Sequence, residues 1–428
     1  MFLEKEGKLI YSYDGETVCI EAWGKDALRV RATKNRSFTG RDWALEAKDA
    51  HAGEVEIFED PSAKGGAFAN MYEGTDTSYG KITNGKIHAV IDSGSVITFY
   101  HEDGRVLLKE HFRRLRDEES MPLNIMGREY SNGVGDNFRI VARFVARKGE
   151  KIFGMGQYQQ HELDLKGCML ELAQRNSQVS VPFYLSSIGY GFLWNNPGVG
   201  QVMFANNGTE WVTESGKEID YLVIAGDTPA EIEENYMTLT GKPPMMPEYG
   251  MGFWQCKLRY WNQEQLLSVA RKYKELGVPL DVIVVDFFHW TKQGEFKFDP
   301  KYWPDVPGMC RELKEMGVQV VVSVWPTVDI YSENFEEMKE KGYLVRTEHG
   351  VPLTMLCGGN EVFFDATNPD ARTYVWEKIK KNYYDQGAKL FWLDVAEPEY
   401  SVYDFKNYRY QLGSVQAVSY THLTLPTT

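Results

Sequence analysis

One short segment of this sequence joins the pattern of a buried strand to a cluster of acids. Lys389–Leu393 is apolar after its first residue, and Asp394, Glu397 and Glu399 follow it closely. In a parallel α/β barrel, catalytic groups lie at the C-terminal tips of the strands. An unpaired acid in an apolar interior is also costly, so it needs a reason to be there. The pattern therefore predicts either an active-site carboxylate at Asp394 or a strand end followed by a solvated turn.

Three earlier apolar segments also lead into side chains that suit a sugar. These segments are 250–256, 281–288 and 318–325. Aromatic rings stack on the C–H faces of sugars while carboxylates bind their hydroxyls, so the combination favours a carbohydrate site. The candidate binding residues are Trp254, Asp286, Phe287, Phe288, Trp290, Trp325 and Trp392. The alternative is that the aromatic side chains fill the interior of a barrel or form part of another core.

Other kinds of site have little support in the sequence. A phosphate site would need a Gly-rich loop, and neither GxGxxG nor GxxxxGK[ST] occurs. The eight histidines are dispersed, without an HExxH motif, so we expect no metal and no cofactor. The net charge of −14 and the lack of a basic stripe argue against nucleic acid as a partner.

The order of predicted elements changes near Lys242–Pro247, where three prolines make a stiff connector. Before it, turns such as Tyr13–Gly15 and Thr83–Gly85 separate short alternating runs, which predicts an antiparallel β-sandwich with one helix from Pro229. After it, strands alternate with helices capped by Asn262 and Asn368, which predicts a parallel sheet with helices outside. The expected domains are 1–243 and 244–417, with 418–428 as a separate tail.

Composition describes an ordinary globular chain of 428 residues, with 43% hydrophobic and 25% charged residues. The charged start of the sequence does not fit a signal peptide, and no stretch approaches the roughly 20 apolar residues of a membrane span. We therefore expect a cytoplasmic protein that does not associate with membranes. The composition is also compatible with a homo-oligomer. The five cysteines are scattered, which predicts reduced thiols: Cys19, Cys168, Cys256, Cys310 and Cys357.

Several motifs resemble those of glycoside hydrolase family 31. Trp392–Glu397 resembles the family's W-[IL]-D-x-x-E nucleophile motif. Gly252–Cys256, Val285–Trp290 and Phe364–Arg372 are similar to its other barrel motifs, in the same order. Upstream, Phe153–Gln157, Gln174–Asn176 and Val181–Tyr184 resemble the β-sandwich that precedes the barrel in this family. The likeness extends to about Ala417, and within the family it is nearest to the α-xylosidase branch.

The resemblance implies a retaining hydrolase of α-linked sugars. Asp394 would be the nucleophile, and Asp286 would bind hydroxyls of the sugar in the −1 subsite. Glu397 would orient the site, or else cap a nearby backbone. Phe287 or Phe288 could form the wall that selects xylose over glucose. The alternatives are an α-glucosidase, an α-galactosidase, a transglycosylase or a non-catalytic carbohydrate-binding protein.

The end of the sequence does not fit a whole barrel. A (β/α)8 barrel needs about 250 residues, yet Lys389–Leu393 would be only its fourth strand. We therefore expect an incomplete barrel of four strands, in which the general acid that the family carries on a later strand is absent. Such a chain should be inactive as it stands. The tail Val418–Thr428 resembles a translated sequencing adapter, which suggests a truncated gene model.

Overall fold

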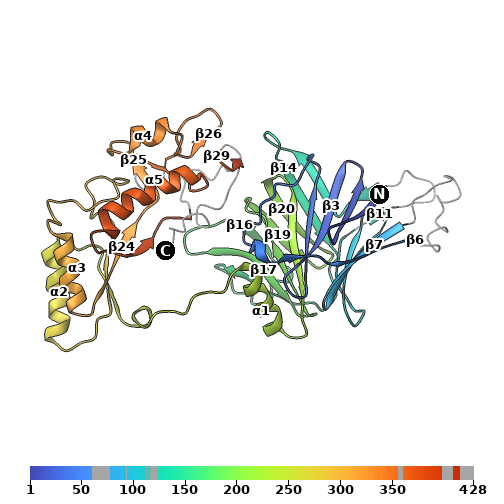
Figure 1. Cartoon of the computed structure of the whole chain (residues 1–428), viewed down its shortest axis with the longest axis horizontal. Helices are drawn as coiled ribbons and strands as arrows, with labels where there is room; N and C mark the ends of the chain where they lie inside the picture. The colour runs from blue at the N-terminus through green and yellow to red at the C-terminus, as the bar shows by residue number, and fades with distance from the viewer. Residues whose placement is uncertain are drawn as a thin grey trace. The chain divides into compact units, whose positions relative to one another are not determined.

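The computed structural model of this chain describes residues 1–59, 78–92, 94–111, 113–115, 123–354, 360–397 and 408–414 (Figure 1). The chain divides into two compact units. The first consists of Met1–Ala173 and Ser177–Pro243, and the second of Gln174–Asn176 and Pro244–Thr428.

The first unit is built from antiparallel sheets (Figure 1). The largest has the order β1 (Phe2–Lys5), β2 (Lys8–Tyr13), β3 (Glu16–Trp23), β4 (Ala27–Thr33), β21 (Ile219–Ala225), β18 (Tyr190–Trp194), β17 (Val179–Ser186), β15 (Ile152–Gln157), with β5 (Ala50–His51) beside β3. A second has the order β10 (Val106–Lys109), β9 (Ile97–His101), β8 (Ile87–Ile91), β7 (Ser78–Asn84), β6 (Glu54–Glu59). A third has the order β13 (Arg128–Asn132), β14 (Phe138–Phe144), β20 (Gly208–Gly216), β19 (Gly200–Ala205), β16 (Met169–Leu172). The smaller elements are β11 (Arg113–Leu115) paired with β12 (Leu123–Ile125), a 3₁₀ turn at Ala47–Asp49, and helix α1 (Pro229–Thr240).

The predicted hairpin turns are present. Asp14 and Gly15 join β2 to β3 with φ values of 49° and 73°, the left-handed pair that a type I′ turn requires. Gly85, with φ 55°, turns β7 into β8, while the side chain of Asn84 donates to the carbonyls of Gly24 and Ala27. The sequence therefore predicted these connections from the residues that tolerate positive φ.

One hydrophobic core joins the three large sheets. It includes Ile20 and Val30 from the first sheet, Ile82 from the second, and Phe144 and Trp211 from the third. All five side chains are at most 1% exposed. The β-rich unit predicted from alternating residues is therefore a layered structure in which each sheet buries its apolar face against another.

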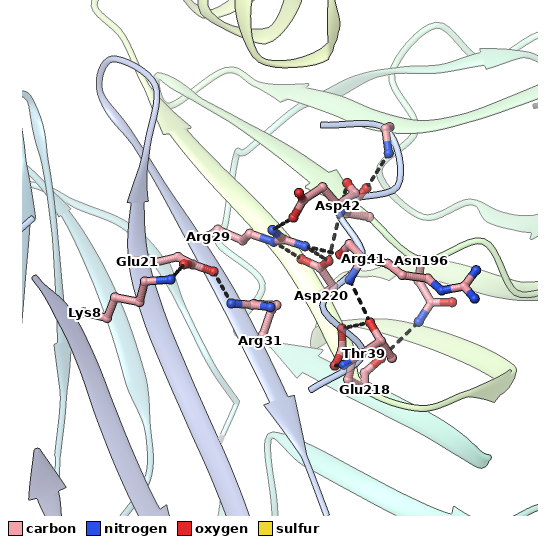
Figure 2. Close-up of polar contacts among 12 residues, drawn as sticks. Lys8, Glu21, Arg29, Arg31, Thr39, Arg41, Asp42, Asn196, Glu218 and Asp220 are labelled. Atoms are coloured by element: carbon pink, nitrogen blue, oxygen red, sulfur yellow. Dashed lines mark hydrogen bonds and ion pairs between the residues drawn. The ribbon is translucent and has the colours of Figure 1, made fainter. Parts of the chain in front are cut away.

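A buried ion pair holds the segment that follows β4 (Figure 2). Arg29 on β4 donates to both carboxylate oxygens of Asp220 on β21, at 2.9 and 2.6 Å, and to Asp42 at 2.7 Å. Nearby, Glu218 accepts from the backbone N–H and the hydroxyl of Thr39, both at 2.8 Å. The loop that contains Thr39 and Asp42 is therefore held in place by two charged side chains, Arg29 and Glu218.

The second unit contains the parallel sheet that the alternating elements predicted. Its order is β22 (Trp254–Cys256), β23 (Val282–Val285), β24 (Gln319–Val324), β28 (Leu390–Leu393). The helices are α2 (Gln263–Glu275), α3 (Val306–Glu315), α4 (Phe335–Glu340) and α5 (Pro369–Ile379), which continues into a π-helical turn at Lys380–Tyr384. The smaller elements are a 3₁₀ turn at Glu248–Met251, β25 (Thr327–Asp329) paired with β27 (Glu361–Phe363), and a small sheet of β26 (Arg346–Thr347), β29 (Tyr408–Tyr410) and β30 (Gly413–Ser414).

Helices α2 and α5 begin where the sequence predicted. The side chain of Asn262 accepts from the N–H of Gln265 at the start of α2, and Gly277 follows its end with φ 65°. At α5 the side chain of Asn368 accepts from the N–H of Asp370. Helix α4 and the π-helical turn were not predicted. Among the helices of the described residues, none combines the length and apolarity that a bilayer span requires.

The two faces of the parallel sheet have different roles. On one face, residues such as Ile283 and Val322 belong to the same core as the apolar side chains of α2, α3 and α5. On the other face, Val282, Val284 and Val321 form a smaller cluster. Successive side chains of a strand point to opposite faces, so the residues that continue this second series at the strand ends face away from the helices.

Candidate active site

Asp394 directly follows β28 and is held on both carboxylate oxygens. The indole N–H of Trp325 donates to Oδ2 at 3.1 Å, and the backbone N–H of Val395 donates to Oδ1 at 3.0 Å. The N–H of Asp394 itself donates to the carbonyl of Val324, which extends the pairing with β24 by one residue. Asp394 is half-buried. The side chain is therefore fixed in orientation while part of it faces solvent.

The residue after this acid has an unusual backbone conformation. Val395 has φ 58°, a left-handed value that costs energy for a β-branched residue, and it is 9% exposed. Such strain persists where surrounding structure imposes it, and it concentrates at functional sites. At Asp394 it accompanies a turn in which the backbone N–H of the next residue reaches the carboxylate.

Asp286 follows β23 in a similar way. The backbone N–H of Phe287 donates to its Oδ1 at 2.8 Å, and Phe288 has φ 65°. The thiol of Cys256, at the end of β22, lies 3.5 Å from Oδ2 of Asp286. Burial and the nearby charge of Asp286 raise the pKa of Cys256 to about 11, so the sulfur is a protonated thiol at neutral pH. The carboxylate is therefore positioned by its own loop and by the neighbouring strand.

Aromatic rings connect the two acidic strand ends. The ring of Phe287 lies 5.1 Å from that of Trp325, and Trp290 lies 6.1 Å from Trp325. Phe288 lies 4.3 Å from Phe287 and is 52% exposed. Since Trp325 also bonds to Asp394, it links the loop after β23 to the acid after β28. A small pocket beside it is lined by Trp290, Gln293, Gly294, Phe296, Val324, Trp325 and Tyr383.

Two predicted aromatic residues lie elsewhere on the sheet. The prediction that Trp254 lies at the end of its strand is wrong. Trp254 is the first residue of β22, where it pairs with Val282. The short strand starts late because residues 248–251 form a 3₁₀ turn. Trp392 lies within β28 opposite Ser323, and it is 51% exposed. The roles of Trp254 and Trp392 in sugar binding stay predictions.

Arg259 was not singled out in the sequence, but it contacts the aromatic loop. Its Nη1 donates to the carbonyl of Phe288 at 3.0 Å. Its guanidinium lies 5.2 Å from the ring centre of Phe288 and 4.1 Å from that of Trp261. The bond supports the left-handed backbone of Phe288. No spacing rule could have identified this contact, because it depends on how two separate loops meet.

His289 was also missed. It is 2% exposed, and both ring nitrogens are within 2.9 Å of a polar atom: Nδ1 of the carbonyl oxygen of Asp286, and Nε2 of the hydroxyl of Tyr383. Burial lowers its pKa to about 4, so the ring is neutral near pH 7. Its position three residues after Asp286 was visible in the sequence, but its burial was not.

Of the other residues named in the sequence analysis, some lie in the part of the chain that the structure describes and others do not. Glu397 is half-buried, and its orienting role stays a prediction. Glu399, Cys357 and the tail at 418–428 lie outside the described residues. Among the residues that are described, the cysteines are free thiols, and no cluster of three or more His, Cys, Asp or Glu side chains could hold a metal ion.

Two family models match the chain. Residues 17–202 match the glycosyl hydrolase 31 N-terminal galactose mutarotase-like domain, and residues 243–422 match the glycosyl hydrolases family 31 TIM-barrel domain. An uncharacterized family 31 glucosidase ORF2 from Pseudescherichia vulneris is 45% identical over 97% of this chain and 77% of its own length. Alpha-xylosidase A from Aspergillus niger is 31% identical over 89% of this chain and 52% of its own length.

A solved structure supports the same assignment. The crystal structure of a GH31 α-xylosidase from a soil metagenome, complexed with xylose, superposes with a TM-score of 0.88 at 49% identity. The match covers 98% of this chain and 61% of that protein. This chain therefore spans somewhat more than half of the length of the solved enzyme and about half of the Aspergillus one.

Proposed function

Because this chain belongs to glycoside hydrolase family 31, we propose that it carries the nucleophile and sugar-binding part of a retaining α-glycosidase. The observation that carries this proposal is the fixed carboxylate of Asp394, held on one oxygen by Trp325 and on the other by the backbone of Val395. A nucleophile must meet the anomeric carbon in one orientation, and a preorganised carboxylate meets that need.

The proposed mechanism is a double displacement. A carboxylate oxygen of Asp394 attacks the anomeric carbon, the bond to the leaving oxygen breaks, and that oxygen takes a proton from a carboxylic acid. The same group then removes a proton from water as the water displaces Asp394 from the sugar. We propose that this general acid comes from the part of the family barrel that the chain does not match, since the chain covers 61% of the solved α-xylosidase.

We propose xylosides as the substrates, with Asp286 binding hydroxyls and Phe287 and Phe288 forming an apolar wall. Phe288 is 52% exposed, two residues after Asp286 and 4.3 Å from Phe287, and we expect its ring to obstruct the hydroxymethyl group of glucose. The soil-metagenome relative binds xylose in its crystal structure, and the Aspergillus relative is named an α-xylosidase. An α-glucosidase is the second candidate because the relative from Pseudescherichia is named a glucosidase.

The test uses a 5-fluoro-α-xylosyl fluoride, with the corresponding glucosyl reagent as a comparison. Fluoride leaves without a proton donor, so the reagent can report the nucleophile in the 428-residue chain itself. We expect mass spectrometry to find one added fluoroxylosyl group on the peptide that contains Asp394, faster than with the glucosyl reagent. Asp394→Asn should take up no label. Labelling of another residue, or of none, would refute Asp394 as the nucleophile, whereas faster glucosyl labelling would favour the glucosidase.

A second measurement tests the origin of the general acid. Aryl α-xylosides with poor leaving groups need protonation, so we expect the 428-residue chain to turn them over negligibly even if Asp394 is labelled. Appreciable hydrolysis would show that the acid lies within the chain. It would not affect the assignment of the nucleophile.

A further inference from the structure

The buried pair His289 and Tyr383 has no role in the proposed chemistry, yet it lies directly behind the loop of Asp286. Both side chains are at most 2% exposed, and the ring of His289 packs against Trp290 and Phe298 at 4.8 and 4.9 Å. Buried polar groups need partners, because an unpaired group in an apolar interior is costly. Each polar atom of this pair has one.

The partners determine where the proton of the imidazole lies. The backbone oxygen of Asp286 can only accept, so Nδ1 of His289 must carry the hydrogen in the 2.9 Å bond. Burial lowers the pKa of His289 to about 4, so the ring is neutral and Nε2 carries no hydrogen. Nε2 therefore accepts, and the hydroxyl of Tyr383 donates to it over 2.9 Å.

The π-helical turn explains how Tyr383 reaches this position. Buried residues of α5 recur every four positions at Ala371, Val375 and Ile379. On an α-helix each step of four residues advances about 40° around the axis, so the series drifts from one face. The π-helical turn has more residues per turn, as the bond from the N–H of Asp385 to the carbonyl of Lys380 shows. It therefore rotates Tyr383 back towards the face of Ile379. Turns of this kind often occur at functional sites.

The loop that the pair supports is strained. Phe288 has φ 65°, which is unfavourable for a bulky residue, so the conformation needs outside support. His289 holds the loop at the carbonyl of Asp286, and Arg259 holds it at the carbonyl of Phe288. Phe287 lies between these two bonds along the chain, and Asp286 is the residue that the first bond holds.

We infer that Tyr383 and His289 are positioning residues of the sugar site. The hydroxyl of Tyr383 donates to Nε2 and holds the imidazole in place, and the Nδ1–H of the imidazole holds the carbonyl of Asp286 so that its carboxylate and the rings of Phe287 and Phe288 face the sugar. This inference rests on the proposed function, in which those three side chains contact substrate.

The first experiment measures the tautomer and does not depend on activity. The 428-residue chain is labelled with ¹⁵N-histidine, and the signal of His289 is assigned by its loss in His289→Asn. We expect long-range ¹H–¹⁵N spectra to show a protonated Nδ1 and an unprotonated Nε2 that do not titrate between pH 5 and 8. In Tyr383→Phe, Nδ1 should stay protonated because the carbonyl of Asp286 still accepts from it, and the ¹⁵N signal of Nε2 should shift because Nε2 loses its donor. A wild-type ring that carries its proton on Nε2, or that titrates near its ordinary pKa, would overturn the inference.

The second experiment compares two variants in the labelling of Asp394 by 5-fluoro-α-xylosyl fluoride. His289→Asn keeps a donor at the place of Nδ1, whereas His289→Gln keeps one only near the place of Nε2. We expect the Gln variant to label roughly tenfold more slowly than the Asn variant, the effect of one lost buried hydrogen bond. Equal rates would overturn the positioning role. Failure of the wild-type chain to label, with the expected tautomer present, would instead count against the proposed function.

Discussion

The buried ion pair of the first unit allows a quantitative test of how this chain tolerates an internal charge. Arg29 is 0% exposed, and Asp220 accepts from it on both carboxylate oxygens, at 2.9 and 2.6 Å. The Nδ2 of Asn195 donates to the second of these oxygens at 2.8 Å. Each oxygen of Asp220 therefore faces a donor. The substitution Asp220→Asn replaces one oxygen by an NH₂ group, which must then face a donor whichever way the amide is turned.

The expected cost follows from that geometry. Removing one partner of a buried ion pair costs about 3–5 kcal/mol, because the other charge stays buried and uncompensated. Arg29 keeps its bond to Asp42, whose side chain is 32% exposed, so we expect the lower end of the range. About 3 kcal/mol in the free energy of unfolding corresponds to a factor of roughly 100–200 in the equilibrium between folded and unfolded states.

Hydrogen exchange in increasing urea, measured on peptides from β4 and β21, reports the unfolding of the first unit alone. Asp42→Asn is the matched control, because a partly exposed partner should cost less than about 1 kcal/mol. The double variant Arg29→Met with Asp220→Leu should recover most of the loss, because it removes both charges of the buried pair. Equal and small costs for Asp220→Asn and Asp42→Asn would refute the reasoning.

Three further predictions concern the second unit. The pKa of His289 falls from about 6.5 in the unfolded chain to about 4 in the folded one, so the unfolded state binds more protons between these values. Stability should therefore decline as pH falls from 6.5 to 4, by about 3 kcal/mol, and urea titrations should show a shallower decline in His289→Asn. Asn262→Ala removes the N-cap of α2 and should cost about 1 kcal/mol in the same assay, whereas a cost near zero would contradict the role of the bond to Gln265. Trp325→Phe keeps an aromatic ring but loses the N–H that reaches Asp394, and labelling by the fluoroxylosyl reagent should slow by about tenfold; an unchanged rate would show that the bond from Trp325 does not orient the acid.

Much of the fold was predictable because local chemistry determines it. Asp14 with Gly15 specified a hairpin, since few residues adopt positive φ at both positions. Asn262 and Asn368 specified helix starts because their side chains bond the free N–H groups. The short β22 and the late start at Trp254 were not predictable, because they depend on a 3₁₀ turn at 248–251 rather than on any residue pattern.

The sequence by itself determined the family, the parallel strands and the acids Asp286 and Asp394 at their ends, since motif and alternation are properties of neighbouring residues. Tertiary structure decided which groups support those acids. Trp325 bonds to Asp394 across 69 residues of sequence, and His289 contacts Tyr383 across 94. Such contacts depend on how strands, helices and a π-helical turn pack together. Burial likewise comes only from the assembled core and makes His289 neutral, and the bonds to Asp286 and Tyr383 give its proton one position.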